Sequence, residues 1–135
     1  MPSTIAEWDP SGSALVTLLA QAARGPRREG VFALWLAVRV TQDLLLDPPF
    51  PERAHRRRVA ALEQRLTSLT MAAPLRRALL AAIAQLREGE PASVSVILSQ
   101  LVAPARETLG AEAAEAVALA VRGAKARKPA GSAKV

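Results

Sequence analysis

The stretch HRRRVAALEQRLTSL, residues 55–69, decides the fold that the sequence predicts. Its inward positions follow one another at intervals of four, three, four and three residues, the spacing of a helix face packed against a nearly parallel or antiparallel neighbour. Pro51 suits the first turn of such a helix, because the amide that proline lacks has no partner there. We therefore predict a helix over 51–70 with a buried seam: His55, Val59, Leu62, Leu66 and Leu69.

A second helix is expected directly after this one. Pro74 opens it, and Gly89 is expected to cap its C-terminal end. Because the connection between the two helices is short, they should form an antiparallel hairpin. The inward residues of the second helix share one face: Leu75, Leu79, Ile83 and Leu86.

Two further helices are expected before the hairpin. Ser13 is placed as the N-cap of the first, which Gly25-Pro26 ends. The second, over 29–46, is apolar on nearly all sides, so we predict that it is the central helix and that Trp35 belongs to its core. The inward face of the first helix is expected to hold Leu15, Leu18, Leu19 and Ala22.

The segment after Pro91 is ambiguous, because the alternation over 93–98 also fits a strand. We predict a helix, since the apolar residues fit a 3.6-residue period as well and no second strand exists to pair with it. Pro104 should kink or break this helix. A last helix begins near Ala111, and its inward face is made of small residues: Ala113, Val117, Ala120, Val121 and Ala124.

The composition fits this arrangement. Half of the 135 residues are hydrophobic and only 3% are aromatic, so the core must be built from Leu, Val, Ile and Ala, which favours helices. The fold class predicted is all-α, a compact bundle of about five to six helices. Residues 1–124 are expected to form a single helical domain, and 125–135 a disordered basic tail without large apolar groups.

The positive charge is concentrated in two segments. The chain carries a net charge of +6, residues 51–88 and 122–135 each contribute +5, and the remainder is acidic. Arginine forks of this kind contact phosphates or acidic partners, but we favour the interpretation of a solvated helix surface, partly balanced by Glu52 before Arg56. The candidate polyanion-binding residues are Arg53, Arg56, Arg57, Arg58, Arg76, Arg77, Lys125, Arg127 and Lys128.

Two observations weaken the nucleic-acid hypothesis. Few aromatic residues are present to stack on bases. The second helix of the hairpin is also too apolar for a typical groove-reading helix. In addition, the hairpin arginines fall into two groups near opposite ends of the hairpin or on different faces, so they need not form one patch. Ala, Arg and Leu together dominate the chain, a bias that a high-GC genome produces without selection for arginine.

No catalytic set is recognisable. His55 is the only histidine, there is no cysteine, and no glycine-rich phosphate loop occurs. His55 is interpreted as a helix-end packing residue, and the pair Glu112 and Glu115 as a complement to a helix dipole. We expect no enzymatic activity, no cofactor and no metal.

The most apolar window, 31–46, is interrupted by polar residues and too short for a membrane span. The first residues lack a basic region followed by an apolar stretch, so we expect a cytoplasmic protein. The sequence thus predicts a non-enzymatic interaction or assembly module, with a protein partner or a second copy of itself. The alternative is a nucleic-acid-backbone binder that uses the arginine hairpin and tail. The role of Trp8, an N-terminal plug or a docking residue, stays open.

Overall fold

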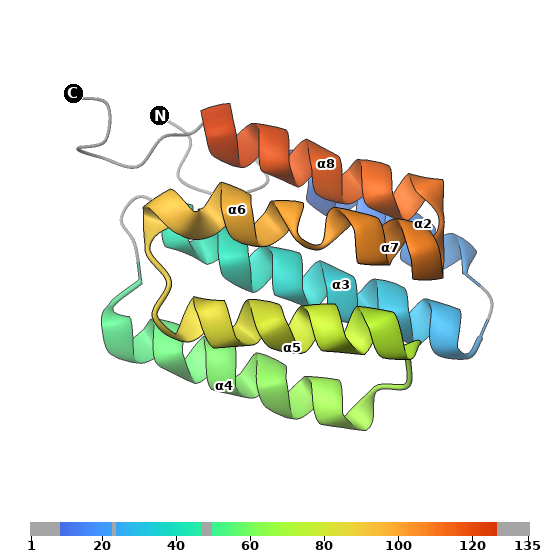
Figure 1. Ribbon diagram of the computed structural model, residues 1–135, viewed down its shortest axis with the longest axis horizontal. Helices are drawn as coiled ribbons and strands as arrows, with labels where there is room; N and C mark the ends of the chain where they lie inside the picture. The colour runs from blue at the N-terminus through green and yellow to red at the C-terminus, as the bar shows by residue number, and fades with distance from the viewer. Residues whose placement is uncertain (1–8, 23, 47–49, 127–135) are drawn as a thin grey trace.

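The computed structural model describes residues 9–22, 24–46 and 50–126. Within these ranges all regular structure is helical and no strand occurs, so the all-α prediction is confirmed, including the helical choice for residues 93–98. Trp8, Arg127 and Lys128 lie outside the described residues. The elements, labelled in Figure 1, are α2 (Ser11–Gln21), α3 (Pro26–Gln42), η1 (Asp43–Leu45), α4 (Glu52–Ser68), α5 (Ala73–Arg87), η2 (Pro91–Ser93), α6 (Val94–Ser99), α7 (Val102–Leu109) and α8 (Ala111–Ala126).

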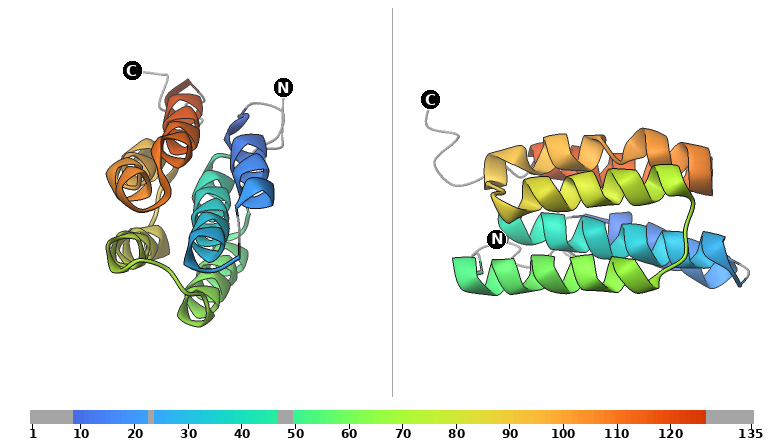
Figure 2. Two further views of the ribbon diagram at one scale, coloured as in Figure 1. Left: turned by 90° about the vertical axis from the view of Figure 1, so that its right-hand side faces the viewer. Right: turned by 60° about the horizontal axis from the view of Figure 1, so that its bottom comes forward.

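The helices form a compact bundle of two layers. One layer contains α2, α3 and α4, and the other contains α5, the α6–α7 pair and α8 (Figure 2). The helix α3 contacts all the other α-helices of the bundle, so it is central as predicted. The layers are joined at their edges, where α2 meets α8 and α4 meets α5.

One continuous core of aliphatic side chains lies between the layers. The seam predicted from the sequence points into it, because His55, Val59, Leu62 and Leu66 are buried, whereas Leu69 lies just after α4 and is half-buried. The inward residues predicted for α5 and α8 are buried as well. Trp35, expected in the core, packs against it but is only half-buried.

Two helix starts differ from the prediction. The helix α2 begins at Ser11, and its first amide is capped by the Asp9 carboxylate, whose Oδ1 accepts from the Ser11 N–H at 3.0 Å. Ser13 is therefore an exposed residue inside the helix. Pro26, predicted to end one helix, opens the next, because its fixed φ suits a first turn and Gly25 before it supplies the bend at φ 110°.

Gly89 does not cap α5 with a left-handed residue. Among the described residues, the only positive φ angles belong to Gly25 and Gly110. A Cβ on Gly89 would lie 3.0 Å from Leu44 Cδ1 and 3.1 Å from the Leu86 carbonyl oxygen, so a larger residue here would require its neighbours to shift. The prediction placed glycine correctly at the helix end but for the wrong reason.

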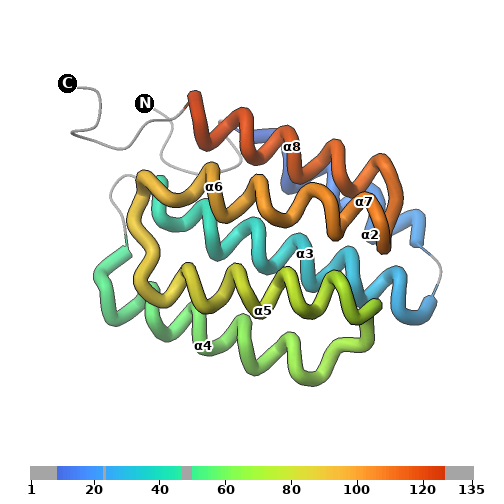
Figure 3. Tube along the Cα trace, viewed as in Figure 1, coloured from blue at the N-terminus to red at the C-terminus, as the bar shows by residue number. Residues whose placement is uncertain are grey.

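The predicted break near Pro104 occurs one turn earlier than the proline itself. The helix α6 ends at Ser99 and α7 begins at Val102, which puts Pro104 in the first turn of α7, where its missing amide is tolerated (Figure 3). The last helix continues to Ala126. Lys125, predicted to begin the tail, therefore lies in the last turn of α8, and residues 127–135 lie outside the described part.

Candidate functional site

Two of the predicted polyanion-binding arginines are engaged in the fold. Arg58 donates from Nε to Asp43 Oδ2 at 2.5 Å, and its guanidinium lies 5.1 Å from the centroid of the Phe50 ring. Arg76 donates to the backbone carbonyl of Leu66 at 2.8 Å and to that of Leu69, which satisfies acceptors left open at the C-terminal end of α4. These two side chains stabilise the α3–α4–α5 packing.

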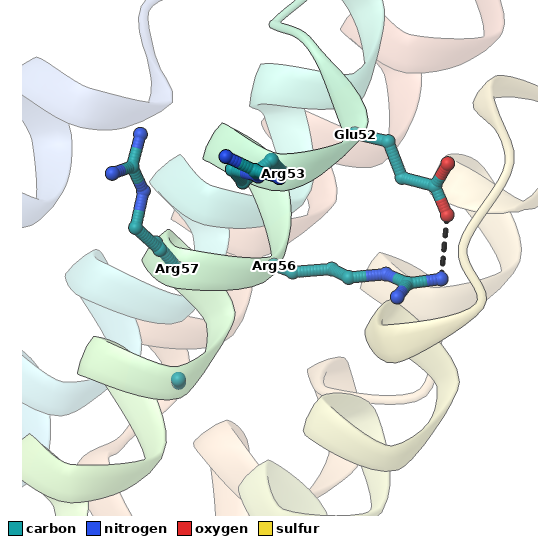
Figure 4. Close-up of a pocket in the computed structure, with 5 residues that line it drawn as sticks. Glu52, Arg53, Arg56 and Arg57 are labelled. Atoms are coloured by element: carbon teal, nitrogen blue, oxygen red, sulfur yellow. Dashed lines mark hydrogen bonds and ion pairs between the residues drawn. The ribbon is translucent and has the colours of Figure 1, made fainter.

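The other predicted arginines of the hairpin are exposed, and they lie in two groups at its opposite ends. At the start of α4, Arg56 pairs with Glu52 at 2.5 Å, Arg57 points away from that pair, and Arg53 lies between them (Figure 4). These residues line a shallow surface hollow of about 450 Å³. Arg77 lies at the opposite end of the hairpin, at the start of α5. Within the described ranges, Arg53, Arg57 and Arg77 have no hydrogen-bonding or acidic partner.

The fold does not gather the predicted residues into one patch. Lys125 is exposed on α8, in the layer opposite α4, and the two remaining tail residues are outside the described part. The fan of Arg53, Arg56 and Arg57 is the largest group of predicted residues that the structure brings together. Its guanidinium groups point in different directions, and none of the residues that line the hollow is aromatic.

A second basic surface was not predicted from the sequence. On α3, the rings of Phe32 and Trp35 stack with their centroids 6.0 Å apart and their planes at 26°. Arg39 lies over Trp35 at 5.8 Å, and Arg65, from α4, lies over Phe32 at 5.6 Å. We call these four residues the arginine–aromatic face.

In the part of the chain that the structure describes, each guanidinium group of this face lies over an aromatic ring, and the charge of Arg39 also acts on the Asp43 carboxylate. Among the described residues, neither Arg39 nor Arg65 donates a side-chain hydrogen bond or pairs with a carboxylate, and both are exposed. A ring holds a guanidinium flat by cation–π attraction and leaves the donors at its edge available. The spacing of Phe32, Trp35 and Arg39 at i, i+3 and i+7 was visible in the sequence, but the prediction assigned Trp35 to the core.

The outer surface of α5, α6 and the start of α7 differs from both basic surfaces because it carries no charge. No charged residue occurs over 78–86 or 91–105. Val96 is 54% exposed and Leu80 41% exposed, while Gln85 Nε2 donates to Gln100 Oε1 at 2.6 Å across α5 and α6–α7. We call the exposed residues of these segments the neutral face: Leu80, Ala81, Ala84, Gln85, Ala92, Val96, Ser99, Gln100 and Ala103, with Pro91 at its edge.

These two faces lie on opposite sides of the bundle. The helix α3 packs across the layer interface against α5, α6 and α7, so the exposed residues of the two layers point away from each other (Figure 2). A ligand on one face would therefore leave the other face open.

Buried polar groups fasten helix ends together. Asp9 Oδ2 accepts from Ser11 Oγ at 2.8 Å and from Gln42 Nε2, which ties the start of α2 to the end of α3. His55 Nε2 lies 2.9 Å from the Leu86 carbonyl oxygen and donates to it, because a carbonyl only accepts, and its buried Nδ1 has no partner in the described structure. His55 thus joins the start of α4 to the end of α5, as expected of a packing residue.

Asp43, the first residue of η1, is also a buried acid. Burial raises the pKa of its carboxyl above the usual 3.8, and the hydrogen bond and charge of Arg58 offset part of that rise. Among the acids of α8, Glu112 lies in the first turn and Glu115 pairs with Arg122 at 3.2 Å. The described residues contain no group of three or more His, Asp or Glu side chains arranged to hold a metal ion.

Comparison with known proteins gives no match, whether with family models, curated proteins or solved structures. Of the helices in the described ranges, none has the length and apolar character needed to cross a membrane. The surfaces of this chain therefore carry the functional evidence.

Proposed function

We propose that this chain is a non-enzymatic assembly module that pairs with a second copy of itself through the neutral face. The observation that carries the proposal is a two-helix-wide surface without charge on a chain whose net charge is +6. Burying such a surface costs no desolvation of ions, and its exposed valine and leucine gain from leaving water.

Electrostatics favours a second copy as the occupant. Two molecules of this charge repel wherever their arginines meet, since like charges brought together cost several kcal/mol. Contact through the neutral face keeps the arginine–aromatic faces of both copies on the outside. A twofold arrangement also brings Gln85 and Gln100 of each copy near the amides of the other, so that polar groups buried at the centre find partners.

A competing surface exists on α2. This helix also carries no charged residue, and its Val16 is 48% exposed. It offers only one helix, however, and the groove between α2 and α8 is bordered by Glu112 and Glu115. The comparison of Val16 with Val96 therefore distinguishes the two surfaces.

Light scattering after size exclusion tests the proposal. The parent should elute at twice the chain mass of 14.3 kDa. Val96→Arg should be a monomer, because each dimer would bury two new charges at the twofold contact. The matched control Val16→Arg, an equally exposed valine on another helix, should stay dimeric. A monomeric parent, or dissociation by the control alone, would contradict the proposal.

A second candidate function, contact with nucleic-acid phosphates, is favoured by a separate observation. Arg39, Arg53, Arg57 and Arg65 all lie on the α3–α4 layer, and none forms an ion pair with a carboxylate of the described residues. Salt-sensitive binding of a short single strand, measured by fluorescence anisotropy, tests this function. Absence of binding at low salt would rule it out.

A further inference from the structure

The α4 arginines and the arginine–aromatic face carry similar charge but different geometry. Arg53 and Arg57 extend into solvent from the start of α4 (Figure 4). Arg39 and Arg65 are instead held against rings that are themselves half-buried and stacked on each other. Side chains held in this way lose less rotational freedom when they bind an anion.

The face has the composition that single-stranded nucleic acid requires. Bases stack on aromatic rings and on guanidinium planes, while guanidinium edges donate to phosphate oxygens. An acidic peptide needs only the charge, which Arg53 and Arg57 supply equally well. The combination of rings and cations on one face therefore favours a single-stranded nucleic acid over an acidic peptide.

The dimensions agree with this ligand. From Phe32 to Arg39 the helix rises about 10 Å, which corresponds to about three stacked nucleotides. One turn before Phe32, Arg28 is exposed on the same side of α3, with one N–H donated to the Leu19 carbonyl oxygen at 2.5 Å. Of the acidic residues of α3 and η1, the Glu29 carboxylate accepts from the Thr70 N–H at 3.1 Å and Asp43 is paired with Arg58.

We infer that the arginine–aromatic face is a binding site for single-stranded nucleic acid, in which Arg39 and Arg65 contact phosphates and their planes receive bases. The inference rests on the second candidate function above and is independent of self-association. It assigns that function to four residues, of which Trp35 had been interpreted from the sequence as a core residue.

The test uses an oligothymidylate of about ten nucleotides and two double variants of equal charge. Arg39→Gln with Arg65→Gln should weaken binding about tenfold more than Arg53→Gln with Arg57→Gln. The first variant should also flatten the plot of log affinity against log salt by about 1.4, since each lost contact to a single strand contributes about 0.7. Circular dichroism checks that both variants remain helical.

Fluorescence of Trp35 gives a readout that charge alone would not produce. With Trp8→Phe in the background, Trp35 is the one remaining tryptophan, and the strand should change its emission. Replacing Arg39 and Arg65 by Lys keeps the charge but removes the planar groups. That variant should keep most of the salt dependence and lose at least half of the emission change.

Each other outcome overturns the inference. Equal weakening by the two Gln variants would show binding by diffuse charge, which leaves the second candidate function standing. Equal affinity for a duplex without a change in Trp35 emission would mean backbone contact alone. Equal competition by polyglutamate would indicate an acidic protein partner. Absence of any strand binding at low salt would remove both the inference and the second candidate function.

Discussion

The arginine–aromatic face and the neutral face differ in what surrounds their exposed apolar groups. On α3 and α4, the half-buried rings of Phe32 and Trp35 are each covered by an arginine. On α5 and α6, Leu80 and Val96 are exposed within segments that contain no charge. The first arrangement repels a second copy and attracts a polyanion, whereas the second does neither. The placement of charge therefore distinguishes the two proposed binding surfaces.

Part of the positive charge is engaged with backbone carbonyls at helix ends. Arg27 donates to the Leu109 carbonyl oxygen at 2.6 Å, Arg28 to that of Leu19, and Arg76 to those of Leu66 and Leu69. These arginines close the C-terminal ends of α7, α2 and α4, where carbonyls lack partners within the helix. A count of basic residues therefore overestimates the surface available to a polyanion.

The largest effect is expected from the core that supports both faces. Leu66→Ala in α4 and Leu98→Ala in α6 each remove a fully buried side chain, so each should lower the free energy of unfolding by about 2–5 kcal/mol. Urea denaturation measures this change. A cost below about 1 kcal/mol at either position would show that the layer above it packs loosely.

A smaller effect should separate two neighbouring arginines at the start of α5. Arg76→Gln removes the bonds to the α4 carbonyls and should cost about 1–3 kcal/mol. Arg77→Gln changes the same charge at an exposed site and should alter stability by less than about 0.5 kcal/mol. Equal costs for the two variants would contradict the structural role assigned to Arg76.

The smallest effect concerns Asp43, beside the arginine–aromatic face. Because its folded pKa is raised above 3.8, the native state holds this proton more tightly than the unfolded chain, and its contribution to stability falls as pH rises through that window. Asp43→Asn has no such proton. Relative to the parent, the variant should therefore gain stability as pH rises from below 3.8. Urea unfolding across a pH series measures this, and a relative loss over the same range would reverse the assignment.

The sequence predicted those features that depend on local periodicity. The spacing of His55, Val59, Leu62 and Leu66 defined the buried side of α4, and Pro104 marked the break between α6 and α7 within one turn. Asp9 capped α2 in place of Ser13, because the choice between nearby capping residues depends on where α3 lies.

The candidate surfaces were harder to predict, since they depend on contacts between distant segments. The pairs of Arg58 with Asp43 and of Arg65 with Phe32 join α4 to the α3 region, and the sequence carries no signal for them. The neutral runs 78–86 and 91–105 were visible in the sequence. Only the antiparallel packing of α5 on α6 and α7 places them side by side.

The measurement closest to the central claim is light scattering of the parent and of Val96→Arg, each with and without the oligothymidylate. If the two faces act independently, the parent should remain a dimer and bind two strands, while Val96→Arg should be a monomer that binds one strand with unchanged affinity. Dissociation of the parent by the strand, or loss of strand binding in Val96→Arg, would contradict the account, because one surface would then serve both functions.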